Sequence, residues 1–437
     1  MISVFAARRE ALLQRLLPNS VVVVPGHDLQ IRNSDVDHRF RQRSDLWFLT
    51  GFTEPEACAV LRTAHGETRA TYSLFVRPRD TEREIWNGRR AGVEGAKERF
   101  GADQAFECGA IAAELPKLLD GADHLYFLLG DDAHWDGVVI GALKALRSGE
   151  RRGMRAPTVI HDLRTTLHEL RLRKDEDGLT KLRRAADIAA EAHNLAMRTA
   201  NGGMREYEIE ALLEFQFRRS GGQPGYGTIV GAGDNANILH YVDCRDEMAK
   251  GDMLLVDAGC EIDGFTSDIT RTFPIGARFS AAQKRVYQTV LTVEKACIEM
   301  TRPGVTIDQI HERAVRLLTE GMVDLGLLSG KVEDLIDKGD YRRFYMHRTS
   351  HWLGMDVHDV GAYSLGGKPR PLEPGMVLTI EPGLYIAASS EGVPEELRGI
   401  GVRIEDDVVV TAEGTEVLTK KAVKEVDQIE ELTGAPR

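Results

Sequence analysis

Short apolar runs that predict strands alternate with longer, helically spaced runs over the first third of the chain. The strand-like runs are four to six residues long, and the first helix-like run is amphipathic. Such alternation favours an α/β fold for this part of the protein. We expect helices at residues 4–17, 110–118 and 137–146, and strands at residues 21–26, 46–51, 71–76 and 125–129.

The pattern changes near residues 172–176, where long helical periodicities begin. A polar, basic segment at residues 149–157 indicates a linker, and a strand-rich region closes the chain. We therefore expect two domains, comprising residues 1–174 and residues 175–437. The helices expected in the second domain span residues 182–204, 206–219, 281–302 and 307–325.

Three acidic residues stand at the ends of apolar runs that predict buried strands. Asp257, Glu381 and Glu405 each close such a run, and Asp268 follows Asp257 by eleven residues. A buried charge without a partner costs several kcal/mol, so each carboxylate needs a cation. No matching set of lysines and arginines accompanies them. The pattern therefore points to metal ions.

The spacing of Asp257 and Asp268 predicts that they share one face of a hairpin. Asp263 and Gly264 lie between them, and Asp-Gly is a strong signal for a two-residue hairpin loop. This loop places the two aspartates as diagonal neighbours across the strands, with Cβ atoms less than about 7–8 Å apart. A register shift of one residue would put them on opposite faces.

Four histidines lie near these carboxylates in the sequence, and composition does not select the ligand among them. His347, His351 and His358 fall within twelve residues, and His240 ends another apolar run. Four carboxylates and one imidazole balance two divalent cations and suit Mn²⁺, with Co²⁺ or Zn²⁺ as alternatives. Cys260 is a conceivable soft ligand, but a small core residue is the favoured interpretation.

Composition narrows the class of protein. A net charge of −12 and a pI of about 5.6 argue against a nucleic-acid partner. Five scattered cysteines without a CxxC motif indicate reduced thiols in a cytoplasmic protein. No signal-peptide core precedes the first helix, and no apolar run approaches the roughly 20 residues of a membrane helix.

Five motifs around these residues together resemble the ligand motifs of the pita-bread metallopeptidases, and within them the bacterial aminopeptidase P family. They lie at residues 256–259, 267–273, 350–354, 379–383 and 403–406. Residues 33–35, 41–52 and 84–90 are similar to the N-terminal domain of that family. The resemblance implies a C-terminal pita-bread domain preceded by a smaller α/β domain, an α/β (α+β) protein overall.

The resemblance also implies a reaction and a ligand set. The reaction is release of the first residue of peptides with proline in second position, by a hydroxide that bridges two metal ions. Asp257, Asp268 and Glu405 would hold one ion. Asp268, His351, Glu381 and Glu405 would hold the other.

Other roles are carried over from the same resemblance. Glu381 would act as general base, and His347 would help to move protons. His240 and His358 would contact the substrate and the developing oxyanion. Tyr226 and Arg403 would orient ligand carboxylates. Relatives usually have glycine after the residue that matches His347, whereas this chain has Arg348. This arginine would either change only a loop or add a positive charge near the mouth of the site.

Alternatives remain at this stage. A prolidase would use the same metals on Xaa-Pro dipeptides, and a catalytically inactive binding protein or a relative of creatinase would lack metal ligands. The family likeness further implies a homo-oligomer, tetramer before dimer, in which Trp86 narrows the substrate entrance of a neighbouring subunit. The competing interpretation buries Trp86 in its own domain.

Overall fold

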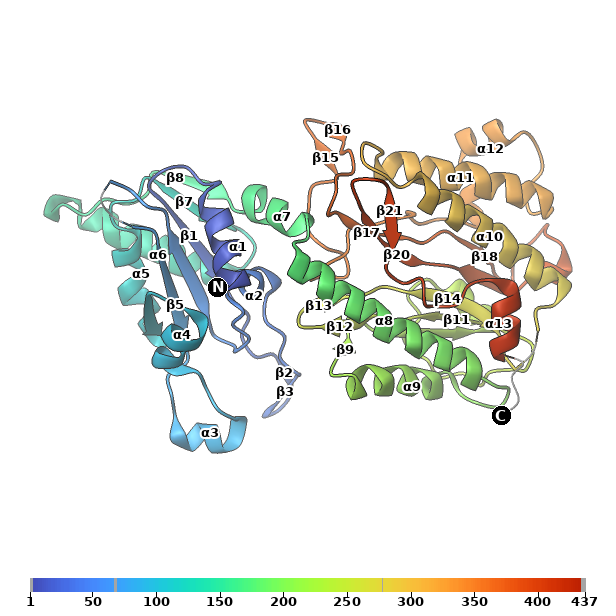
Figure 1. The fold of residues 1–437 in the computed structure, drawn as a ribbon, viewed down its shortest axis with the longest axis horizontal. Coiled ribbons are helices and arrows are strands. Elements are labelled where there is room, and N and C mark those ends of the chain that lie inside the picture. Colours follow the sequence, from blue (N-terminus) through green and yellow to red (C-terminus); the bar gives the residue numbers. More distant parts are fainter. Residues whose placement is uncertain (1–2, 67–68, 277, 434–437) are drawn as a thin grey trace. The chain divides into compact units, whose positions relative to one another are not determined.

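The structure is a computed structural model that describes residues 3–66, 69–276 and 278–433. It divides into two compact units, Met1–Arg171 and Leu172–Arg437 (Figure 1). Across the described ranges, no helix combines the length and the apolar character needed to cross a membrane. All five cysteines fall within these ranges and are free thiols.

A six-stranded mixed sheet forms the centre of the N-terminal unit. Across the sheet its strands are β6 (Gln104–Glu107), β5 (Thr71–Val76), β4 (Cys58–Arg62), β1 (Ser20–Pro25), β7 (His124–Phe127) and β8 (Val159–Asp162). Strand β4 runs antiparallel to both of its neighbours, whereas the other adjacent pairs are parallel. A separate small hairpin joins β2 (Ile31–Asn33) to β3 (Val36–Asp37).

Helices pack against this sheet, and all six residues of its central strand β1 are buried, so both faces of that strand are covered. Val21 and Val23 of β1 share an apolar core with Leu115 and Val139 from two of the helices. The helices are α1 (Val4–Leu13), α2 (Ser44–Thr50), α3 (Thr81–Asn87), α4 (Gly92–Phe100), α5 (Ile111–Leu119), α6 (Ala133–Ser148) and α7 (Arg164–Leu172), with short 3₁₀ turns at Cys108–Ala110 and Glu150–Arg152.

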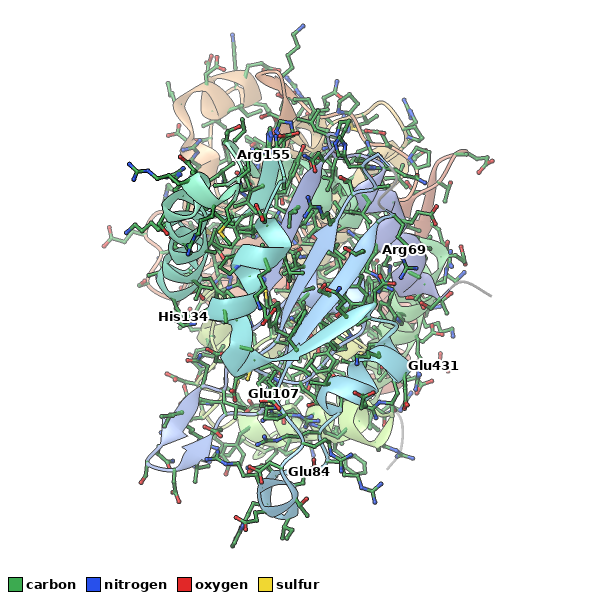
Figure 2. The ribbon with its side chains drawn as sticks, turned by 90° about the vertical axis from the view of Figure 1, so that its left-hand side faces the viewer. Arg69, Glu84, Glu107, His134, Arg155 and Glu431 are labelled. Carbon is green, nitrogen blue, oxygen red and sulfur yellow. The ribbon has the colours of Figure 1, made fainter. Side chains whose placement is uncertain are left out.

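Helix α3 differs from the other helices of this unit. The structure describes all of its residues, and none of them is buried. Figure 2, which labels Glu84 on this helix, shows α3 standing apart from the sheet at the lower end of the unit. Trp86 is therefore 86% exposed, and the interpretation that buries it in its own domain is wrong.

Two expectations for the N-terminal region are wrong. The strand expected at residues 46–51 is part of helix α2, because a short apolar run suits a buried helix as well as a strand. Gly51 ends this helix with a φ of 69°, a conformation that glycine adopts without strain. The segment at residues 149–157 is a loop inside the unit, since β8 follows it and pairs with β7.

Small antiparallel sheets and long helices make up the C-terminal unit. The helices are α8 (Glu176–Thr199), α9 (Glu206–Arg219), α10 (Ala281–Met300), α11 (Ile307–Asp324), α12 (Val332–Lys338) and α13 (Val426–Thr433), with 3₁₀ turns at Gly233–Asn237, Asp340–Arg343 and Glu395–Leu397. The strands are β9 (Gln223–Pro224), β10 (Ile229–Ala232), β11 (Met253–Asp257), β12 (Cys260–Ile262), β13 (Phe265–Thr266), β14 (Thr270–Pro274), β15 (Ser364–Leu365), β16 (Lys368–Pro369), β17 (Val377–Ile380), β18 (Gly383–Ile386), β19 (Ile400–Arg403), β20 (Asp406–Val410) and β21 (Thr415–Val417).

The long helices lie across these strands (Figure 1) and bury a single apolar core with them. Helices α10 and α11 begin at capping boxes formed by Ser280 with Gln283 and by Thr306 with Gln309. Both helices therefore start where the sequence periodicity predicts. Cys260 belongs to this core, as its favoured interpretation expected.

The hairpin predicted around Asp263 and Gly264 is confirmed. Ile262 pairs with Phe265, and Asp257 pairs with Thr270, so one register runs the length of the hairpin. Asp263 and Gly264 both have positive φ, at 49° and 83°, as a type I′ turn requires. The predicted register therefore directs the two aspartates to a common face.

Candidate metal centre

Asp257 and Asp268 meet at the hydroxyl of Tyr226. The Tyr226 Oη lies 2.6 Å from Asp257 Oδ1 and 2.5 Å from Asp268 Oδ1. A phenol has one proton, so it can donate to only one of these oxygens at a time. The second short contact needs a proton or a cation nearby. Both aspartates are buried, which increases that need.

Backbone pairing brings His351 to Glu381. The segment around His351 runs alongside β17, where the N–H of Thr379 donates to the carbonyl of His351 at 3.0 Å. His351 Nε2 consequently lies 3.4 Å from Asp268 Oδ2 and 3.6 Å from Glu381 Oε1. Burial lowers the pKa of His351, but hydrogen bonding to Asp268 and the charge of Glu381 outweigh it and raise the pKa to about 9.

The tautomer of His351 indicates what belongs between these groups. Its Nδ1 lies 3.0 Å from the carbonyl of Trp352, which can only accept, so Nδ1 carries a proton. With a pKa of about 9, the ring also holds a proton on Nε2, the nitrogen that faces the two carboxylates. A metal ion can take the place of this proton, and a carbonyl bond to the second nitrogen is the usual arrangement of a ligating histidine.

Glu405 completes a tight group of possible ligand atoms. One ligand atom each from Asp268, His351 and Glu405 lies within 4.8 Å of the others. Burial and the neighbouring carboxylates raise the pKa of Glu405 well above its usual range, and burial raises the pKa of Glu381 to about 7. Raised pKa values mean that these carboxylates do not ionise easily side by side. Cations favour the ionised form of each carboxylate, so these residues fit a metal centre.

Arg403 ties the acidic groups together from behind. Its Nη2 donates to Asp257 Oδ2 at 2.6 Å, and its Nε donates to Thr270 Oγ1 at 2.9 Å. Thr270 Oγ1 in turn donates to Glu405 Oε2 at 2.6 Å. One guanidinium thus orients Asp257 directly and Glu405 through a hydroxyl.

His347 stands at the end of a directional chain of hydrogen bonds. Arg403 Nη1 donates to Tyr385 Oη at 3.1 Å, and Tyr385 Oη lies 2.8 Å from His347 Nε2. His347 Nδ1 donates to the carbonyl of Arg348 at 2.7 Å, and it lies 3.7 Å from Glu381 Oε2. Burial and the charge of Arg403 lower the pKa of His347 to about 3, consistent with a neutral ring.

One cavity of about 750 Å³ is bordered by the five predicted metal ligands and by Tyr226, His347 and Arg403. His240 and His358 line it as well, and both are exposed. The His358 ring packs edge-on against His351, with ring centroids 4.4 Å apart. Every site residue predicted in the C-terminal domain therefore borders this cavity, whereas Trp86 belongs to the N-terminal unit.

Three residues hold predicted site residues in place but were not predicted from the sequence to do so. Thr270 supports Glu405, and Tyr385 joins His347 to Arg403. Asp407 accepts the backbone N–H of Asp268 at 3.0 Å. Thr270 had a signal, since it shares a strand face with Asp268, but the partners of Tyr385 and Asp407 come from distant segments.

Comparisons with known proteins agree with this geometry. Residues 180–412 match Metallopeptidase family M24, and residues 5–126 match the aminopeptidase P N-terminal domain. The chain therefore belongs to the M24 metallopeptidases. The expected pita-bread domain, preceded by a smaller α/β domain, is confirmed.

Individual relatives are similar over nearly their whole length. The Xaa-Pro aminopeptidase of Escherichia coli K12 is 45% identical over 434 residues, which are 99% of this chain and 98% of that protein. The structure of Pseudomonas aeruginosa aminopeptidase PepP has a TM-score of 0.96 at 47% identity and covers 99% of both chains. Zinc-substituted E. coli aminopeptidase P in complex with product has a TM-score of 0.95 at 45% identity, over 98% of this chain and 97% of that chain.

Replacing Thr270 tests the support behind Glu405. Thr270→Val keeps the shape of the side chain but removes the donor to Glu405 and the acceptor for Arg403. We expect affinity for Mn²⁺ to fall about 10-fold to 100-fold, measured by calorimetric titration of metal-free protein. Thr272→Val is the matched control, because the Thr272 hydroxyl bonds only to the backbone of Arg403 among the described residues. Equal affinities in both variants would contradict the role of Thr270.

Proposed function

We propose that this protein is a metal-dependent Xaa-Pro aminopeptidase, which releases the first residue of peptides whose second residue is proline. The convergence of Asp268, His351 and Glu405 in one cavity carries the proposal. The sequence identity of 45% to an Xaa-Pro aminopeptidase, over almost the entire chain, also supports the proposal. A complete ligand set disfavours an inactive binding protein, and the relatives favour this activity over that of a prolidase.

The cofactor in this proposal is a pair of divalent cations, with Mn²⁺ preferred and Co²⁺ or Zn²⁺ as alternatives. Asp257, Asp268 and Glu405 would hold one ion, and Asp268, His351, Glu381 and Glu405 the other. When bound, such ions supply Lewis acidity, which polarises the scissile carbonyl and acidifies water. Oxygen-rich ligands with a single imidazole are the chemical basis for preferring Mn²⁺.

Proton movement is assigned to Glu381 and His347. Glu381 takes a proton from the attacking water and delivers it to the proline nitrogen as the bond breaks. His347 Nδ1 lies 3.7 Å from Glu381 Oε2 and the ring is held by Tyr385, so a small shift or one bridging water would let it exchange protons with Glu381. Neither step uses an N–H on the scissile bond, which the proline imide lacks.

His240 and His358 are assigned to the substrate. Both are exposed and line the cavity close to the proposed ligands. We assign them to orientation of the peptide carbonyl and stabilisation of the oxyanion that forms from it. Tyr226 and Arg403 keep the ligand carboxylates in position.

The proposal extends to assembly and location. Trp86 and Ile85 present large exposed apolar surfaces on α3, 86% and 79% exposed, which is typical of residues that pack against a partner. We propose a homo-oligomer, tetramer or dimer, in which Trp86 narrows the substrate entrance of a neighbouring subunit. The free cysteines favour a cytoplasmic location, and the acidic chain favours peptides over nucleic acids or membranes as partners.

Substrate and metal dependence test the activity directly. We expect cleavage of Ala-Pro-Ala after the first residue, with little cleavage of Ala-Ala-Ala. Dialysis against a chelator should abolish activity and Mn²⁺ should restore it best, as followed by release of free alanine. Cleavage of the dipeptide Ala-Pro without cleavage of Ala-Pro-Ala would indicate a prolidase. Full activity in metal-free protein would contradict the metal-dependent mechanism.

Two histidine variants separate ligand from substrate-binding roles. His351→Ala should lose bound metal, because it removes a proposed ligand while the fold is kept. His358→Ala should keep its metal and lose about 10²–10³ in kcat, the usual cost of removing one donor to an oxyanion. Metal content by atomic emission and kcat on Ala-Pro-Ala are the measurements. Loss of metal from His358→Ala would show that the roles are misassigned.

Trp86→Ala tests the proposed entrance. We expect weaker cleavage of tripeptides at unchanged metal content, with Leu129→Ala as the control because Leu129 is an exposed apolar residue of the same unit outside α3. Sedimentation of the wild-type protein gives the oligomeric state. A monomer at concentrations where the enzyme is fully active would rule the proposal out.

A further inference from the structure

Arg348 lies at the rim of the cavity rather than at its floor. It follows His347 directly in the chain, and both residues line the same cavity. The Arg348 side chain is 57% exposed, whereas the Glu381 side chain is 16% exposed. Its guanidinium therefore borders the cavity where the cavity meets solvent.

No other permanent cation among the described cavity-lining residues faces solvent. Arg403 is the one further arginine in that lining, and lysine is absent from it. Arg403 is buried and bound to Asp257, Tyr385 and Thr270, so it is committed to the centre itself. Arg348 is thus the cation that an incoming anionic group meets.

The present partner of Arg348 is easily exchanged. Within the described part of the chain, its guanidinium forms one ion pair, with Asp308 in the first turn of α11. Asp308 also lines the cavity, and its side chain is 47% exposed. Exposed ion pairs contribute about 0–1 kcal/mol, so another carboxylate can compete for the arginine. The N-terminus of α11 continues to stabilise Asp308 after such an exchange.

The direction of the substrate decides which of its groups reaches this rim. An aminopeptidase encloses one residue on the N-terminal side of the scissile bond, and the rest of the peptide has to leave towards solvent. The part that passes Arg348 is therefore the part after proline. The planar fork of arginine suits a carboxylate there, because it can donate two parallel hydrogen bonds.

We propose that Arg348 binds a carboxylate carried by the first one or two residues after proline, and so selects peptides that are acidic there. This rests on the proposed aminopeptidase activity. The carboxylate can be the C-terminus of a short peptide or an aspartate or glutamate side chain. The pairing with Asp308 holds the guanidinium at the rim until such a group arrives.

Matched peptides separate the two sources of the carboxylate. The first pair is Ala-Pro-Ala with a free or an amidated C-terminus. The second pair is Ala-Pro-Glu and Ala-Pro-Gln, both amidated. For each pair we measure kcat/KM for the acidic peptide and divide it by kcat/KM for the neutral peptide. A substitution at Arg348 could also disturb the neighbouring His347, but that effect is the same for both peptides and cancels in the ratio.

We expect Arg348→Gln to lower at least one ratio about tenfold or more, the usual worth of a hydrogen bond to a charged group. Arg348→Lys should be intermediate, since it keeps the charge without the fork. Asp308→Asn should raise the same ratio, because it removes the competing carboxylate. Arg316→Gln, which breaks an exposed ion pair on α11 outside the cavity, is the control and should match the wild type. Inhibition by Pro-Ala and by amidated Pro-Ala gives a separate binding readout.

The outcomes distinguish the two proposals. Peptide cleavage with both ratios equal in wild type and Arg348→Gln would overturn the role of Arg348 and leave the aminopeptidase activity intact. A rise of either ratio in Arg348→Gln, relative to the wild type, would overturn that role too. Failure of the wild-type protein to cleave any of the four peptides would overturn the proposed function, and the role of Arg348 with it.

Discussion

The C-terminal unit has to hold four carboxylates close together in one cavity, where they repel one another. Asp257, Asp268, Glu381 and Glu405 border the same space, and burial raises the pKa of three of them, Asp257, Glu381 and Glu405. Such groups repel one another strongly where water is scarce. When cations lie between them, attraction to the cations outweighs this repulsion. A carboxylate cluster that destabilises the metal-free protein is therefore suited to bind metal.

The protein keeps this cluster in place with few positive charges. Arg403 reaches Asp257 directly, Glu405 through Thr270, and His347 through Tyr385. Each of these bonds has one donor and one acceptor, so they set orientation as well as distance. The charge of the carboxylates is left largely uncompensated by protein, which leaves it available for a ligand of higher charge.

A second ionic cluster, behind the centre, anchors the strand that carries Glu405. Asp406 points away from the cavity and is paired at 2.6 Å with Arg271, which also donates to the carbonyl of Glu405 at 2.6 Å. Both side chains of this pair are fully buried. Buried ion pairs add little net stability, but breaking one is costly, so this pair opposes any change in register of Glu405. Lys424 pairs with Asp406 as well and ties in the C-terminal segment.

The sequence by itself determined the local geometry around Asp257 and Asp268, because a two-residue Asp-Gly loop sets the register and the register sets the face. It also predicted the long helices, whose caps and periodicity are local features. Only the tertiary structure decided what depends on distant segments: that Tyr385 joins His347 to Arg403, that Asp407 supports Asp268, and that Arg348 meets Asp308 at the rim. The short run at α2 was decided there too, since a few apolar residues suit either a helix or a strand until their neighbours are in place.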